Sequence, residues 1–136
     1  MKDINRRMAL TIGSAAAAAV PTMVLSTSGS AQTPAGKEVA PGVRRVEYGK
    51  REAMFGGYKS VLLRDNIYQP GSETKNPAMA NDMVCHCLEG ELQIDQGMGM
   101  KFVVKKGDVW TCAKGTPEDT RNAGTTVGIM RVTDLL

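Results

Sequence analysis

The sequence predicts an all-β protein, and three observations support this. Short runs with strand-forming composition recur after residue 43, separated by Gly, Pro, Asn and Asp. Polar and apolar residues alternate in Glu91-Leu92-Gln93-Ile94, as in a half-buried strand. No segment of this part of the chain has a clear apolar period of 3.6 residues, so no helix is expected there. Several short strands joined by glycine-rich turns indicate a sandwich or barrel.

Six segments have the composition expected of strands. Gly97-Met98-Gly99 is a plausible turn between two of them. The expected strands lie near Arg44–Tyr48, Tyr58–Tyr68, Met83–Asp95, Lys101–Lys105, Asp108–Cys112 and Thr126–Thr133.

Residues 1–31 have the order of an export signal, with a basic start, an alanine-rich apolar region and a small-residue end. The adjacent pair Arg6-Arg7 resembles a twin-arginine signal, while an ordinary secretory signal with two neighbouring arginines is the alternative. Pro21 and the low hydrophobicity of the alanine run argue against a stable membrane anchor. A periplasmic or secreted bacterial protein is therefore expected.

Residues 32–42, rich in Pro and Gly, are expected to be a linker, and 43–136 to form one domain. The whole chain of 136 residues carries a net charge of +3. Residues 1–31 account for +2 of this through Lys2, Arg6, Arg7 and Asp3, which leaves +1 after cleavage. Such a balance gives no reason to expect nucleic acid or an anionic membrane as a partner.

The spacing of turn residues between residues 68 and 124 resembles the two signature hairpins of the cupin family. Pro70-Gly71 matches the turn that opens the first motif, and the strand after it ends in Leu88-Glu89-Gly90. The second motif is matched by Gly107-Asp108, by Gly115 with Pro117, and by Asn122. The resemblance implies a single-domain cupin jelly-roll β-barrel that binds a small molecule in its mouth. It also implies a homodimer.

The residues that hold the metal in conventional cupins are absent from this sequence. In the resemblance, the family's glutamate falls on Met83, its first two histidines near Pro77 and Met79, and its last histidine on Glu118. A conventional site of three histidines and one glutamate is therefore not expected. The oxygenase, isomerase or decarboxylase chemistry that depends on it is not expected either.

The only histidine, His86, lies between Cys85 and Cys87. Successive side chains of a strand point to opposite faces, so one metal ion cannot take all three as ligands. If Met83 faces the interior, Cys85 and Cys87 do so too, and His86 faces outward. Together with Cys112, the two cysteines form a candidate soft-metal site for Cu(I) or zinc. Core filling is the simpler interpretation, and a disulfide from Cys112 to one of them is a further alternative.

Glu118 is the best single carboxylate candidate for a site, since it occupies the family's last ligand position. It would bind a hard cation, act as a general base or hold a substrate hydroxyl, although its surroundings are also typical of a solvated turn. Met83, Cys85, Cys87 and Glu118 are the residues expected to line the ligand pocket. Three functions follow as alternatives: a small-molecule binding protein, a metal-dependent enzyme with an atypical ligand set, and a periplasmic soft-metal binding protein. Whether the chain is an enzyme is left open, and so is its cofactor.

Overall fold

The computed structural model describes residues 35–136, so the expected signal peptide lies outside the described residues. The described part contains ten strands and no helix, which confirms the predicted all-β class. Within it, no helix has the length and hydrophobicity needed to cross a lipid bilayer. The strands are β1 (Lys37–Ala40), β2 (Val43–Glu52), β3 (Ser60–Tyr68), β4 (Glu73–Asn76), β5 (Asp82–Glu89), β6 (Glu91–Asp95), β7 (Lys101–Lys105), β8 (Val109–Cys112), β9 (Glu118–Arg121) and β10 (Gly128–Leu135).

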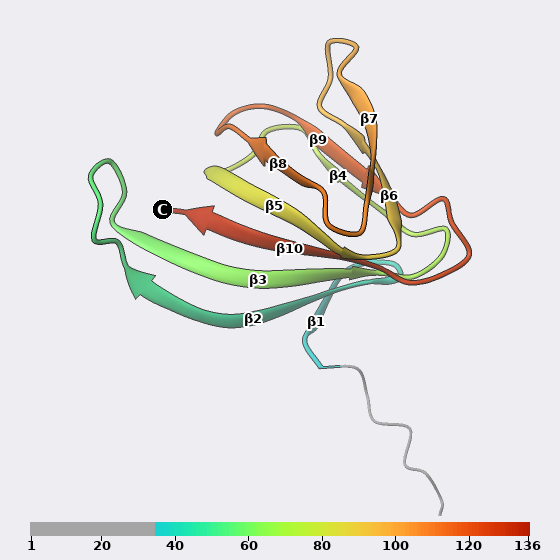
Figure 1. Ribbon diagram of the computed structural model, residues 1–136, viewed down its shortest axis with the longest axis horizontal. Helices are drawn as coiled ribbons and strands as arrows, with labels where there is room; N and C mark the ends of the chain where they lie inside the picture. The colour runs from blue at the N-terminus through green and yellow to red at the C-terminus, as the bar shows by residue number, and fades with distance from the viewer. Residues whose placement is uncertain (1–34) are drawn as a thin grey trace, which may run out of the picture. The chain divides into compact units, whose positions relative to one another are not determined.

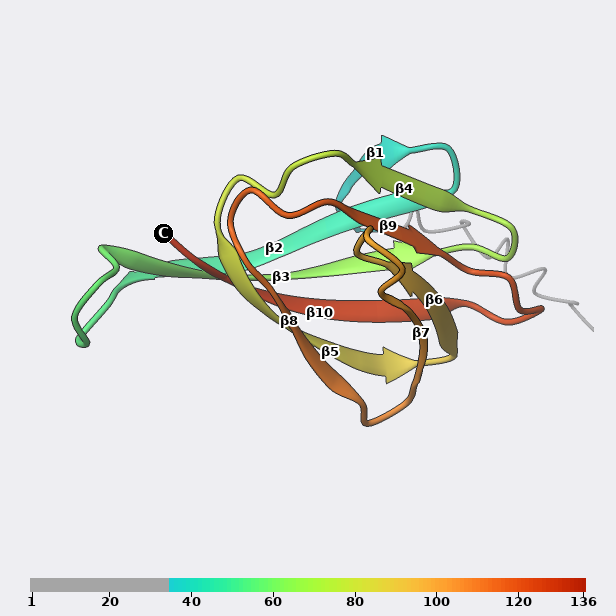
Figure 2. The ribbon, with the colours of Figure 1, turned by 90° about the horizontal axis from the view of Figure 1, so that it is seen from above.

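The strands form two antiparallel sheets that face each other. One sheet has six strands in the order β1-β2-β3-β10-β5-β8, and the other has four in the order β4-β9-β6-β7. Figure 1 shows the four-stranded sheet above the six-stranded one, and Figure 2 shows the same layers from above. The hairpin of β2 and β3 extends beyond the rest at one end (Figure 1). This is the jelly-roll arrangement that the turn spacing predicts.

The core lies between the two sheets because inward positions alternate along the strands. On β5 the buried residues are Met83, Cys85 and Cys87, whereas Val84 is exposed and His86 is half-buried. β10 alternates in the same way along its whole length, with Met130 and Val132 buried. The inward cysteines and the outward imidazole are therefore as the strand geometry predicts.

Three strands were not expected from the sequence, and each is only four residues long. β1 lies inside the expected linker and pairs with β2. β4 and β9 pair with each other in the smaller sheet, with Asn76 opposite Glu118. The sequences of β4 and β9 are polar, so they contain no hydrophobic run and no strand-forming composition from which a strand could be predicted. Glu118 therefore begins a strand, which corrects the alternative that it belongs to a solvated turn.

The expected strand Met83–Asp95 is two strands, joined by a sharp turn at Gly90. Gly90 has φ +73°, a left-handed conformation that side chains other than glycine rarely adopt. A Cβ placed there would lie 2.5 Å from the carbonyl oxygen of Val127. The turn therefore requires glycine both for its backbone angle and for the close approach of the chain before β10.

We predict that Gly90→Ala lowers the free energy of unfolding by about 2 kcal/mol or more, because the left-handed backbone and the steric clash both oppose a side chain. Gly49→Ala is the matched control, since nothing lies within 4 Å of a Cβ at that position. It should be neutral or slightly stabilising. Urea unfolding of both variants measures the difference, and equal stabilities would contradict the role given to Gly90.

Candidate functional site

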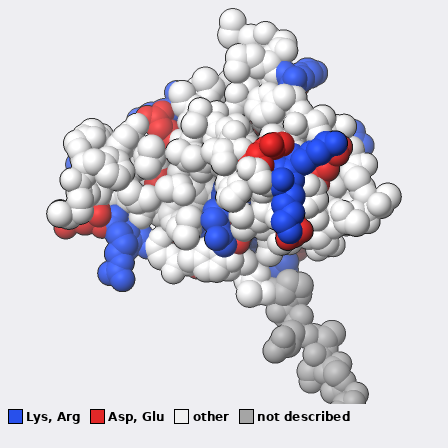
Figure 3. All heavy atoms as spheres, in the orientation of Figure 1, with Lys and Arg blue, Asp and Glu red and all other residues white. Residues whose placement is uncertain are grey.

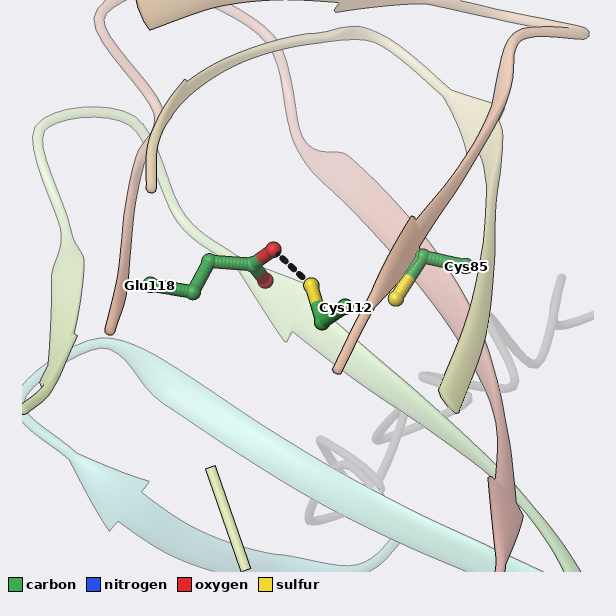
Figure 4. Close-up of side chains that lie close together, drawn as sticks. All are labelled: Cys85, Cys112 and Glu118. Atoms are coloured by element: carbon green, nitrogen blue, oxygen red, sulfur yellow. Dashed lines mark hydrogen bonds between the residues drawn. The ribbon is translucent and has the colours of Figure 1, made fainter. Parts of the chain in front are cut away.

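Cys85, Cys112 and Glu118 converge in the interior, although they come from three different strands. β5 and β8 are paired so that Met83 lies opposite Cys112, which places Cys85 diagonally across from it. Glu118 reaches them from β9 in the other sheet. One ligand atom from each residue lies within 4.8 Å of the other two, and all three residues are buried. Figure 4 shows the carboxylate and the Cys112 thiol pointing toward each other, with Cys85 beside them.

Cys87 does not belong to this cluster, which corrects the predicted metal set of Cys85, Cys87 and Cys112. Its thiol points toward the carbonyl oxygens of Glu89 and Gly90, at 3.5 and 3.7 Å. Cys87 is buried, and it shares the inward face of β5 with Cys85. Because strand residues two apart are separated by about 6.6 Å, Cys87 lies too far along the strand to join the same group. Glu118 takes the place of Cys87 as the third residue that could ligate a metal.

The Glu118 carboxylate is surrounded by neutral hydrogen-bond donors. Its Oε2 atom accepts from Trp110 Nε1 at 3.2 Å, from Gln96 Nε2 at 3.1 Å and from the Cys112 thiol. From the described residues, its Oε1 atom accepts only a long bond of 3.4 Å, donated by Thr120 Oγ1. The first oxygen is therefore well satisfied, as a buried polar group must be, whereas the second retains room for another donor.

The two cysteine thiols of the cluster are free, as is Cys87. The hydrogen bond with Cys112 raises the pKa of Cys85, and burial and the charge of Glu118 raise it further. Cys85 is therefore a protonated thiol at neutral pH. Cys85 and Cys112 are diagonal rather than directly opposite, a separation at the outer limit for a disulfide.

Beside this cluster, a half-open cavity of about 230 Å³ lies between the sheets. Its lining includes buried polar residues such as Arg64, Asn66 and Glu118, which ordinary core packing would not place beside an open space. A second hollow of about 240 Å³ adjoins it and shares Arg45, Arg64, Asn76, Met79 and Met83. A hollow of about 440 Å³ is larger, but it lies on the four-stranded sheet and its lining contains no member of the Cys–Glu cluster. The 230 Å³ cavity is lined mainly by Arg45, Arg64, Asn66, Tyr68, Met79, Met83, Glu118, Thr120, Met130 and Val132.

The structure places the predicted pocket residues unequally around this cavity. Met83 and Glu118 line it, whereas Cys85 and Cys87 do not. Met79 lines it as well, at one of the positions where the cupin resemblance would place a histidine. Thioethers and one carboxylate do not fit the conventional ion, and His86 lies on the opposite face of β5. A three-histidine cupin metal centre is therefore not compatible with these residues.

Two arginines on the inner face were not predicted as site residues. Arg64 is buried and ion-paired with Asp134, with Nε 2.5 Å from Oδ2 and Nη2 3.0 Å from Oδ1. Asn66 Oδ1 accepts from Arg64 Nη1 at 3.2 Å and from Arg45 Nε at 3.3 Å. A signal was present in the sequence: Arg64 and Asn66 occupy alternate positions of a strand, as residues that share one face do.

The comparisons with known proteins concern the fold. No protein-family model matches this sequence, and no curated protein does. The cupin domain of Schizosaccharomyces pombe Cnp3 matches with a TM-score of 0.59 at 18% identity, covering 71% of this chain and 62% of that domain. A double-stranded β-helix protein from Klebsiella pneumoniae matches with a TM-score of 0.60 at 16% identity, over 74% of this chain and 82% of the other. This chain has the cupin fold.

A third similar structure, an RmlC-like cupin from Shewanella frigidimarina, has a TM-score of 0.58 at 19% identity and covers 73% of this chain and 80% of its own. At such identities the likeness establishes the architecture and leaves the chemistry to the residues themselves. The cupin barrel of this chain thus has an interior with two distinct polar regions. One is the Cys–Glu cluster of Cys85, Cys112 and Glu118, and the other is the arginine region of Arg45, Arg64, Asn66 and Asp134.

Proposed function

We propose that this protein binds a small molecule in the cavity between its two sheets. The observation that supports the proposal best is the cavity of about 230 Å³ with polar groups on its walls. Arg45, Glu118 and Thr120 present hydrogen-bonding atoms to it, while Met79 and Met130 supply apolar surface. A few placed polar groups in a hollow that also has apolar walls are typical of ligand sites.

We also propose, from the signal-like residues 1–31, that the protein acts in the periplasm after export by the twin-arginine route. The charges of the folded domain are compatible with a soluble periplasmic binder, since basic and acidic side chains lie interspersed on the face shown in Figure 3. Replacing Arg6 and Arg7 by Lys should retain the chain in the cytoplasm, as measured by cell fractionation. Unchanged export of that double variant would contradict the twin-arginine assignment.

A panel of small carboxylates, polyols and amino acids tests the binding proposal through the thermal midpoint of the protein. A ligand at about a hundred times its Kd stabilises the folded state by about 2.7 kcal/mol, which is readily measured. Met79→Trp should abolish that shift, because Met79 lines the cavity and a larger side chain there fills it.

Met54→Trp is the matched control, since Met54 is 96% exposed on the β2–β3 hairpin, outside the cavity lining. It should bind as the unaltered protein does. If no compound in the panel raises the midpoint of the unaltered protein, the binding proposal is wrong. A shift that survives Met79→Trp would place the ligand elsewhere.

A second candidate function, soft-metal binding, is favoured by one specific observation, the convergence of Cys85, Cys112 and Glu118 within 4.8 Å. Two thiolates and a carboxylate are ligands that zinc accepts, and thiolates also select Cu(I). Three neutral donors already hydrogen-bond to one oxygen of Glu118, and a metal would have to compete with them. Soft-metal binding therefore ranks second. In that case the cluster would bind the metal after losing its thiol protons.

We predict that zinc binds with a stoichiometry of one per chain and that Cys85→Ser with Cys112→Ser removes it, whereas Cys87→Ser does not. Cys87 is the matched control because it is equally buried but lies outside the cluster. The raised pKa of Cys85 lets protons compete with the metal. The apparent affinity should therefore rise with pH, by up to about tenfold per unit for each proton displaced.

Competition with a chromophoric chelator measures zinc affinity in each variant. Binding that is lost equally in Cys87→Ser, or an affinity that does not change with pH, would contradict a site built on these thiols. If the unaltered protein does not bind zinc, the zinc site is wrong and small-molecule binding remains as the proposed function.

A further inference from the structure

Among residues 35–136, the charged groups in the cavity lining have ion-pair partners except for two. Arg64 pairs with Asp134 inside the barrel. At the rim, the exposed Lys75 and Glu73 lie 3.4 Å apart. Arg45 and Glu118 are the remaining charged residues in the cavity lining.

Arg45 lies half-buried on the inner face of β2, opposite Asn66 on β3. Its Nε donates to Asn66 Oδ1, and its Nη atoms donate to no acceptor among residues 35–136. Burial lowers the pKa of Arg45, and the neighbouring charge of Arg64 lowers it further. The carboxylates of Asp134 and Glu47 act in the opposite direction, so Arg64 is not its only charged neighbour. The Nη donors of Arg45 are available to an anion, which would also oppose the effect of burial on the guanidinium.

Glu118 lies in the lining of the same cavity but belongs to the opposite sheet. Its Oε2 atom is saturated by three donors, whereas Oε1 accepts only the 3.4 Å bond from Thr120. A carboxylate oxygen accepts more than one hydrogen bond. Oε1 of Glu118 can therefore accept a further hydrogen bond from a ligand, for example from a hydroxyl or an ammonium group.

We propose that the ligand is a small monocarboxylate that carries a hydrogen-bond donor, with its carboxylate on Arg45 and its donor on Glu118. This rests on the proposed small-molecule function of the same cavity. A planar carboxylate matches the fork of the guanidinium. In the lining as the structure describes it, Arg45 is the one basic residue without an ion-pair partner, so a singly charged anion fits better than a phosphate dianion. A volume of about 230 Å³ lies below the usual range of drug-sized ligand pockets, about 300–1,000 Å³, so we expect a small ligand.

Calorimetric titration with four probes of similar size tests both ends of the ligand. L-lactate has a carboxylate and a hydroxyl, and L-alanine has a carboxylate and an ammonium group. Propionate lacks the donor, and propane-1,2-diol lacks the carboxylate. We expect lactate or alanine to bind at least about tenfold more tightly than propionate and the diol, since each lost charge-assisted hydrogen bond costs about that factor or more.

Arg45→Gln should weaken the preferred probe by about tenfold or more, because the charge is lost and a hydrogen-bonding side chain remains. Arg51→Gln is the matched control, as Arg51 is an exposed residue of the same strand and lies outside the cavity lining. It should leave the affinity unchanged. Thermal unfolding of both variants verifies that they fold.

The outcomes separate this inference from the proposal on which it rests. If the diol binds as tightly as lactate and alanine, the cavity binds small molecules but the carboxylate assignment is wrong. If propionate binds as tightly as lactate and alanine, the proposed hydrogen bond between the ligand's donor and Glu118 is wrong. An affinity that Arg45→Gln leaves unchanged also overturns the inference. If none of the probes binds and the wider panel gives no thermal shift, the small-molecule function itself fails.

Discussion

Arg64 on β3 and Asp134 on β10 place opposite charges inside the barrel, on the two central strands of the larger sheet. Burying a charge is costly unless its partner and further hydrogen bonds replace water. Here two bonds join the groups, and Asn81 and Asn66 each add another. The pair therefore persists as a unit, and it prevents the interior from closing into an apolar core.

The other polar region of the interior is the Cys–Glu cluster, which consists of two thiols and one carboxylate. Trp110, Cys112 and Gln96 all donate to one oxygen of Glu118, so neutral donors satisfy that oxygen of the buried acid. This arrangement gives the cavity two unlike ends, a guanidinium and a carboxylate, on facing sheets. The three histidines of a conventional cupin metal site are absent from these positions, and the proposed ligand with a carboxylate and a donor would match the two unlike ends.

Much of this architecture could be predicted because it depends on local rules. The turn residues defined the jelly roll, and strand alternation sent Cys85 inward and His86 outward. What the sequence could not reveal depends on register between distant strands. Cys112 lies diagonal to Cys85 only because β5 and β8 pair with Met83 opposite Cys112, and Cys87 is excluded for the same reason. Strands as short and polar as β4 carry no periodic signal. The alternation of Arg64 with Asn66 indicates a shared face, but the ion pair depends on the fold, which brings Asp134 beside Arg64.

A crystal structure of the complex with the tightest-binding of the small carboxylates tests the central claim most directly. The account predicts electron density in the cavity between the sheets, with the carboxylate within hydrogen-bond distance of the Arg45 Nη atoms and the donor of the ligand within that distance of Glu118 Oε1. Density for the ligand on the outer surface, or an empty cavity at saturating ligand, would contradict it.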